Sequence, residues 1–281
     1  MNIGPFKAVR IGVKRAAVNW RIWFVVYGLN FVFAAFLALP LAETFAKDIS
    51  KSVAGRDLLY GFNYRWYTGF VTSNGNVLQS FLPQAILIFL IYIIIEIFLA
   101  GGFYSMLCGN QKIGFWEFLA RGSRYFFPLL SITVLECTTL FLLCLAIRGE
   151  LSESVYQSIG VIAVFIIIVL SDFIRAAIVI DDDNFWSKVK RGLSFTALHS
   201  LSTFGVYFCC MIISAMVIGL FFLFHSVNDS TISAGIIVEI LAGQIFVLLR
   251  IFSKLIFYAA EAALYKENQI EIINVNPEML E

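Results

Sequence analysis

Six long apolar stretches constrain this chain more than any other feature of its sequence. A helix that crosses a bilayer needs about 20 mostly apolar residues, and each stretch comes close to that length. The stretches lack the alternation of polar and apolar residues that a transmembrane β-barrel requires, so that fold is excluded. We predict an all-α integral membrane protein whose six transmembrane helices cover approximately residues 22–42, 81–107, 128–147, 159–180, 204–224 and 236–264.

The composition agrees with a membrane environment. Charged residues make up 14% of the chain, whereas a soluble domain carries roughly 25%. The net charge of +1 creates no field that would attract nucleic acid, so we expect the lipid bilayer as a partner and no nucleic acid. The first apolar stretch is similar to the core of a signal peptide. It exceeds the usual length of roughly 7–15 residues, which indicates a retained first span.

Lys and Arg are distributed unevenly over the predicted loops. They gather before the first span, between spans two and three, and between spans four and five, whereas the short third and fifth loops hold only Arg148. Because cytoplasmic loops carry the excess of Lys and Arg, both termini are predicted to face the cytoplasm. Residues 267–281 then form a short acidic cytoplasmic tail, which we expect to be disordered unless a partner orders it.

A short pattern of aromatic residues followed by glycine recurs along the chain. Each copy begins an amphipathic stretch of about a dozen residues that two spans follow, and such a stretch suits a helix at the lipid headgroups. We predict three parallel repeats of an elbow helix plus a transmembrane hairpin, within one domain over 1–266 (units of about 1–110, 111–183 and 184–266). The copies are Phe115-Trp116 with Arg121-Gly122, Phe185-Trp186 with Arg191-Gly192, and a fainter one in which Phe6 and Gly12 keep the spacing of Trp116 and Gly122.

The first outer loop carries an aromatic run from Leu58 to Val71 that includes Arg65. Aromatic side chains concentrate at membrane interfaces, so this run is predicted to lie along the outer headgroups. A lid over a ligand is the alternative. The small polar residues at 73–76 predict a turn into span two.

Eight ionisable residues occur within the predicted spans, where a charge costs about 2.5–3.5 kcal/mol at the centre of a helix. Four of them share one face of the sixth span, roughly 60° wide and about 33 Å long. Such a face cannot point at lipid, so we predict a polar seam that packs inside the bundle or lines water. The four on the sixth span are Glu239, Arg250, Lys254 and Glu261, and the others are Glu96, Glu136, Asp172 and Arg175.

The repeat suggests partners for these charges. Aligning the ends of spans four and six places Asp172 over Lys254, which predicts a buried ion pair near the cytoplasmic third of the membrane. A second pair would join Arg250 to Glu96 or Glu136, since all three lie at similar depth.

The alignment of spans four and six also puts Ala100-Gly101 at the corresponding place in the first unit. Alternatively, Asp172 and Arg175, three residues apart on one helix, could satisfy each other locally.

Two interpretations of the charges are open. Buried pairs can serve only to fix helix packing, because removing one partner costs about 3–5 kcal/mol. Alternatively, the seam forms a polar path or a site that handles a ligand.

The other polar patterns give no catalytic, cofactor or metal site. Asp181-Asp182-Asp183 lacks the further ligands of a divalent cation site, which favours a solvated loop in which Asn184 caps the next helix. His199 and His225 lie near opposite membrane faces, and the five cysteines lack metal-ligand spacing. No Walker A, GxGxxG, HExxH or Ser-His-Asp order occurs, so we expect no cofactor and predict that the chain is not an enzyme.

Three short motifs carry a resemblance to a known group. Gly101-Gly102 ends span two, an aromatic elbow from Phe115 to Phe126 ends in Gly-x-x-Tyr-Phe, and an Asp-x-x-Arg pattern runs from Asp172 to Arg175. Over about residues 1–266, the chain resembles a family of uncharacterised bacterial six-transmembrane-helix membrane proteins. The resemblance implies the six-span fold and a location in the bacterial inner membrane, and it implies no activity.

Three functions are consistent with the sequence. The first is an accessory or assembly component of a membrane complex, with another membrane protein or a second copy of the chain as partner. The alternative is a carrier or channel-like protein for a small or lipid-like solute that uses the charged seam. An intramembrane lipid-modifying enzyme ranks third. A packed interior with paired charges would favour the first function, and a water-accessible cavity that reaches the seam would favour the second.

Overall fold

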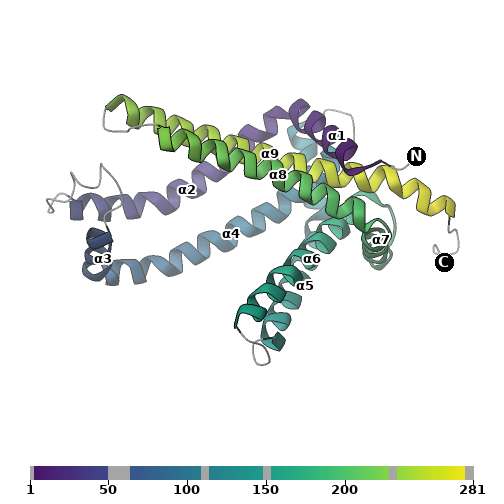
Figure 1. The fold of residues 1–281 in the computed structure, drawn as a ribbon, viewed down its shortest axis with the longest axis horizontal. Helices are drawn as coiled ribbons and strands as arrows, with labels where there is room; N and C mark the ends of the chain where they lie inside the picture. Colours follow the sequence, from purple (N-terminus) through teal and green to yellow (C-terminus); the bar gives the residue numbers. More distant parts are fainter. Residues whose placement is uncertain (1–2, 50–63, 109–113, 148–152, 228–232, 276–281) are drawn as a thin grey trace. The chain divides into compact units, whose positions relative to one another are not determined.

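A computed structural model describes residues 3–49, 64–108, 114–147, 153–227 and 233–275, and all regular structure in these ranges is helical (Figure 1). The predicted all-α class is therefore confirmed. The helices are α1 (Pro5–Val18), α2 (Trp20–Ile49), α3 (Tyr64–Ser73), α4 (Gly75–Leu107), α5 (Phe115–Ile147), α6 (Glu153–Ile180), α7 (Phe185–Leu198), α8 (Ser200–Val227) and α9 (Ser233–Val275).

Six helices in the described part of the chain are long and apolar enough to cross a membrane, which confirms the predicted number of spans. Prolines inside α2, α4 and α5 do not end these helices, as is common in transmembrane segments. The apolar segments are Trp20–Lys47, Gly75–Leu107, Phe115–Leu145, Ile159–Ile180, Ser200–Phe224 and Ile240–Asn268.

Two of the three predicted elbows are separate helices, α1 and α7, and each is joined to its span by one residue, Asn19 or His199. The second elbow differs, because α5 continues without a break from the elbow into the span. The residue at the junction differs too. Asn19 Nδ2 donates to the carbonyl oxygen of Arg15 at 2.9 Å, whereas the corresponding position in α5 is the apolar Leu129.

The end of the chain is more ordered than we predicted. Helix α9 continues to Val275, so the first nine residues of the expected tail, 267–275, are helical. Asn268 explains the extension, because its side chain is buried and its Oδ1 accepts a hydrogen bond from the backbone N–H of Ile3 at 2.9 Å. The N-terminal segment thus contacts the C-terminal part of α9.

The contacts divide the chain into two compact units. Unit 1 comprises Met1–Trp20, Glu96–Ile213 and Phe252–Glu281, and unit 2 comprises Arg21–Ile95 and Ser214–Ile251. Helices α4, α8 and α9 contribute residues to both units, and α2 contributes its first residue, Trp20, to unit 1.

Unit 1 has a core of aromatic and small side chains. In α9, Ala259, Ala260, Ala262 and Ala263 are fully buried, and small residues let transmembrane helices approach closely. Helices α5 and α6 form a hairpin, and α7 packs against α6. The largest fully buried side chains include Phe103, Tyr104, Phe118, Phe173, Phe195 and Tyr265.

In unit 2, two tyrosines form hydrogen bonds between spans. Tyr92 Oη of α4 donates to Asn30 Oδ1 of α2 at 2.9 Å, and Tyr27 Oη of α2 donates to Gln244 Oε1 of α9 at 2.5 Å.

Part of the predicted aromatic run, residues 58–63, lies outside the described residues, and the rest forms most of α3. The turn predicted at 73–76 is confirmed, because α3 ends at Ser73 and α4 begins at Gly75.

Candidate functional site

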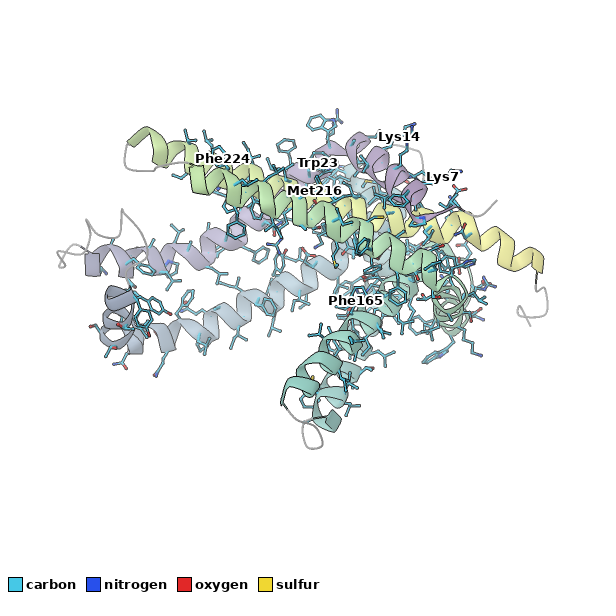
Figure 2. All side chains as sticks on the ribbon, viewed as in Figure 1. Lys7, Lys14, Trp23, Phe165, Met216 and Phe224 are labelled. Carbon is cyan, nitrogen blue, oxygen red and sulfur yellow. The ribbon has the colours of Figure 1, made fainter. Side chains whose placement is uncertain are left out.

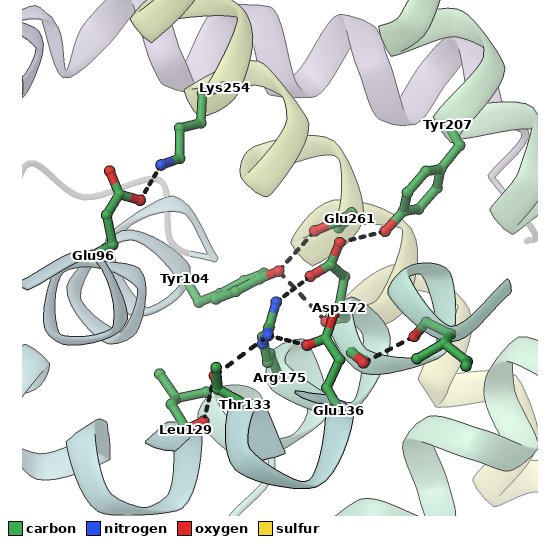
Figure 3. Close-up of polar contacts among 12 residues, drawn as sticks. Glu96, Tyr104, Leu129, Thr133, Glu136, Asp172, Arg175, Tyr207, Lys254 and Glu261 are labelled. Atoms are coloured by element: carbon green, nitrogen blue, oxygen red, sulfur yellow. Dashed lines mark hydrogen bonds and ion pairs between the residues drawn. The ribbon is translucent and has the colours of Figure 1, made fainter. Parts of the chain in front are cut away.

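Arg175 of α6 is the centre of a buried polar cluster in unit 1 (Figure 3). Its Nη1 donates to Asp172 Oδ1 at 2.7 Å, and its Nη2 forms an ion pair with Glu136 of α5 and lies 3.4 Å from Thr133 Oγ1. The side chains of Arg175, Asp172 and Glu136 are 19%, 12% and 12% exposed. The planar guanidinium can bind two carboxylates at once, so Arg175 fastens α5 to α6.

Two tyrosines extend this cluster to three more helices. Tyr207 Oη of α8 donates to Asp172 Oδ2 at 2.6 Å, and Tyr104 Oη of α4 donates to Glu261 Oε2 of α9 at 2.8 Å. Tyr104 Oη also lies 3.4 Å from the backbone oxygen of Asp172. Five helices therefore meet in what we call the Arg175 cluster, made up of Tyr104, Thr133, Glu136, Asp172, Arg175, Tyr207 and Glu261.

Glu261 is the most deeply buried carboxyl group of the Arg175 cluster. The residue is 0% exposed, and its Oε1 has no hydrogen-bond partner among the described residues. A buried polar atom without a partner costs about 1–3 kcal/mol. The hydroxyl of Tyr104 is therefore important for holding this carboxyl group in the core.

A second ion pair lies beside the cluster, between Lys254 of α9 and Glu96 of α4. Its side chains are more exposed than those around Arg175, at 37% for Lys254 and 21% for Glu96. The ring of Tyr258 lies between this ion pair and the Arg175 cluster. Its centroid is 6.0 Å from Lys254 Nζ and 4.9 Å from the centroid of the Tyr104 ring. The pair fastens α9 to α4.

The predicted ion pair between Asp172 and Lys254 is wrong. Asp172 is bound by Arg175, the local alternative, because one helical turn along α6 brings the guanidinium to the carboxylate. Lys254 is bound by Glu96, which faces it from α4.

The predicted pair between Arg250 and Glu96 or Glu136 stays a prediction, and both carboxylates bind other cations, Lys254 and Arg175. Arg250 belongs to unit 2 and its side chain is exposed. The side chain of Glu239 lies outside the described residues. Of the predicted seam on α9, Lys254 and Glu261 are therefore the members that contact charged or polar groups of α4.

Sequence reasoning missed the two tyrosines of the cluster. Both lie in apolar segments, Tyr104 near the end of α4 and Tyr207 in α8. A buried tyrosine hydroxyl usually finds a hydrogen-bond partner. A tyrosine at the same depth in the spans as an ionisable residue could therefore have been predicted to bind it.

The acidic triplet after α6 forms polar contacts with α7 and α9. Arg191 pairs with Asp183 and lies 3.8 Å from Asp181, whose Oδ2 accepts a hydrogen bond from Tyr265 Oη at 2.8 Å. These bonds tie α7 to α9. Asn184 occupies the predicted N-cap position of α7, although its side chain makes no capping bond.

Basic side chains cover the last turn of α4. Arg15 Nη1 donates to the carbonyl oxygen of Leu107 at 2.9 Å, and Lys266 Nζ donates to that of Cys108 at 3.3 Å. Cations at the C-terminus of a helix satisfy its free carbonyls and its dipole. Burial at this place raises the pKa of the Cys108 thiol to about 12.

No family model, curated protein or solved structure matches this chain. The resemblance to a bacterial six-span family stays a prediction.

Proposed function

We propose that this chain is an accessory or assembly component of a complex in the bacterial inner membrane, with a structural role for its intramembrane charges and no enzymatic one. The observation that supports this role is the position of Arg175 between Glu136 and Asp172. Its charge is used to hold α5 and α6 together.

The other charges of unit 1 support the same interpretation. Glu96 and Lys254 bind each other, and Asp172 is bound on one carboxylate oxygen by Arg175 and on the other by Tyr207. A transported ion or solute would have to displace these bonds. Because each side chain already binds a neighbouring helix, the geometry favours a packing role over transport.

The location and orientation follow from the sequence. Both termini lie in the cytoplasm, because Lys and Arg gather in the loops on that side. The partner is a membrane protein or a second copy of the chain, which binds through the spans or the elbows.

Copurification from native membranes tests the proposal. The tagged chain would be extracted in mild detergent beside the triple variant Glu136→Gln, Asp172→Asn, Arg175→Met, which removes the three charges together. We expect a partner at fixed stoichiometry with the wild type, and equal recovery of that partner with the triple variant. A wild-type chain that is recovered as a monomer without a partner contradicts the proposal.

A second candidate function is a carrier of a lipid-like solute, favoured by an apolar pocket in unit 2. The pocket has a volume of about 300 Å³, at the lower end of ligand-binding pockets. Rings of Phe221 and Phe246 lie 4.5 Å apart in it. The lining residues come from α8 and α9 and are Val217, Leu220, Phe221, Phe224, Val238, Leu241, Ala242, Ile245, Phe246 and Leu249.

Native mass spectrometry of the purified chain tests the carrier function. Ala242→Phe would fill the pocket, and Ala38→Phe, at an exposed position of α2, is the matched control. A lipid that is bound by the wild type and the control but lost from Ala242→Phe supports the carrier. Equal lipid retention by all three chains excludes this pocket as the site.

A further inference from the structure

The three predicted elbows pack on unit 1 in the same way, each through its glycine. At each of these glycines a Cβ atom would lie within 2.8 Å of the backbone of a span, so only glycine allows this approach. The first elbow contacts α9, the second contacts α4 and the third contacts α6. The pairs are Gly12 with the oxygen of Ile256 at 2.8 Å, Gly122 with the oxygen of Phe98 at 2.8 Å, and Gly192 with the Cα of Ile174 at 2.7 Å.

These contacts give a register for the three hairpins. A charged residue precedes each contacted residue by two positions, namely Glu96, Asp172 and Lys254. These contacts match Asp172 with Lys254, as the sequence alignment did. In the first hairpin, however, they match Glu96 with these two residues instead of Ala100-Gly101. This register supports the arrangement in three repeats.

Each elbow presents a large aromatic side chain to its surroundings, six residues before its glycine. Phe6 is 80% exposed, Trp116 is 80% exposed and Trp186 is 71% exposed. Other aromatic residues of the elbows are buried in the core, such as Phe118 at 1% and Phe195 at 0%. Each elbow therefore exposes the aromatic residue at this position, and the second and third elbows also bury an aromatic residue.

Exposed cations accompany the aromatic residues. On α1, Lys7 and Lys14 extend outward from the helix (Figure 2). Two acidic residues of this surface, Glu117 and Asp183, are bound by arginines of the same elbows. Among the described residues, the exposed cations of the elbows that form no ion pair are Lys7, Arg10, Lys14, Arg124 and Lys190.

We propose that the exposed face of the elbows is one surface that binds anionic phospholipid headgroups. Phe6, Trp116 and Trp186 insert at the membrane interface, and the five exposed cations contact the lipid phosphates. Aromatic rings and basic side chains are the two features by which helices bind an anionic membrane surface.

The connections of the elbows favour a membrane over a protein as the occupant. A single residue, Asn19 or His199, separates α1 and α7 from the spans that follow, and the second elbow is continuous with its span. The elbows therefore lie within one residue of the bilayer. This inference goes beyond the proposed function, because lipid binding by the elbows needs no partner protein.

Quenching of tryptophan fluorescence by brominated lipids tests the insertion. Three full-length variants would each keep one tryptophan, at position 116, at position 186, or at position 6 through Phe6→Trp, with the other tryptophans replaced by Phe. In vesicles that contain brominated phosphatidylglycerol, we expect similar quenching at all three positions, and about twofold or more stronger quenching than with brominated phosphatidylcholine. Phe36→Trp, at an exposed position within a span, is the control and should be quenched equally by both lipids.

A charge variant tests the preference for anionic lipid. Lys7, Arg10, Lys14, Arg124 and Lys190 would all be replaced by Gln in the single-tryptophan chains. These side chains are exposed, so the thermal stability in detergent should not change, whereas the ratio of quenching by the two lipids should fall to about one. An unchanged ratio overturns the proposal. Quenching of the elbow tryptophans by aqueous iodide instead of brominated lipid also overturns it, and indicates a surface that docks a protein.

Discussion

Arg175→Met should destabilise unit 1 strongly, because it leaves two buried carboxylates without their cation. Arg175 makes a charge-assisted bond to Asp172 and an ion pair to Glu136, and bonds of this kind contribute about 1.5–3 kcal/mol each. Breaking a buried pair from one side costs about 3–5 kcal/mol. The side chains of Glu136 and Asp172 are each 12% exposed. We therefore expect the free energy of unfolding to fall by about 3 kcal/mol, the lower end of this range. The midpoint of thermal unfolding should fall by roughly 6–12 °C.

The assay is thermal unfolding of the purified chain in detergent, followed by circular dichroism and by loss of the monodisperse fraction. The triple variant Glu136→Gln, Asp172→Asn, Arg175→Met is the control, because it removes the cation and both carboxylates together. We expect this variant to recover most of the lost stability. The reasoning is refuted if Arg175→Met unfolds within about 2 °C of the wild type, or if the triple variant is less stable than the single one.

Three further predictions concern other parts of the structure. Gly192→Ala should cost about 1–3 kcal/mol, because its Cβ would meet the backbone of α6, whereas Gly28→Ala, with open space around it, should be neutral or slightly stabilising in the same unfolding assay. Cys108, as the only cysteine of a variant chain, should react with maleimide at pH 8 about 10³-fold more slowly than an ordinary thiol of pKa about 8.5. Its rate should rise with pH up to about 12, because the thiolate fraction rises; a rate equal to that in denaturing detergent would contradict this burial. Tyr104→Phe should cost about 1–3 kcal/mol, since it removes the donor to Glu261, and an unchanged unfolding midpoint would show that this bond contributes nothing.

The sequence predicted the spans well and the partners of the charges poorly. Long apolar stretches predict spans directly, because a backbone inside the bilayer must satisfy its hydrogen bonds internally and a helix does so. A charge in a span must find a partner, but which partner depends on helix rotation and register. The repeat alone placed Lys254 beside Asp172. In the structure, Asp172 instead binds Arg175, three residues along the same helix, and Lys254 binds Glu96 of α4.

Some features had a weak signal in the sequence, and others had none. Tyr104 and Tyr207 could have been expected to bond near the charges, because their hydroxyls need partners inside a span. The helical end of α9 could not be foreseen from its acidic composition. It depends on a contact between Asn268 and Ile3, residues at opposite ends of the chain.

The composition of unit 1 from both ends of the chain has a consequence for the order of synthesis. Glu96 and Tyr104 enter the membrane with the second span, long before Lys254 and Glu261 of α9 exist. The face of α1 around Gly12 likewise waits for Ile256. Until α9 is inserted, Glu96 lacks its ion pair with Lys254, and the face of α1 around Gly12 lacks the backbone that covers it. A chain that stops before α9 lacks both contacts, which distinguishes it from a finished protein.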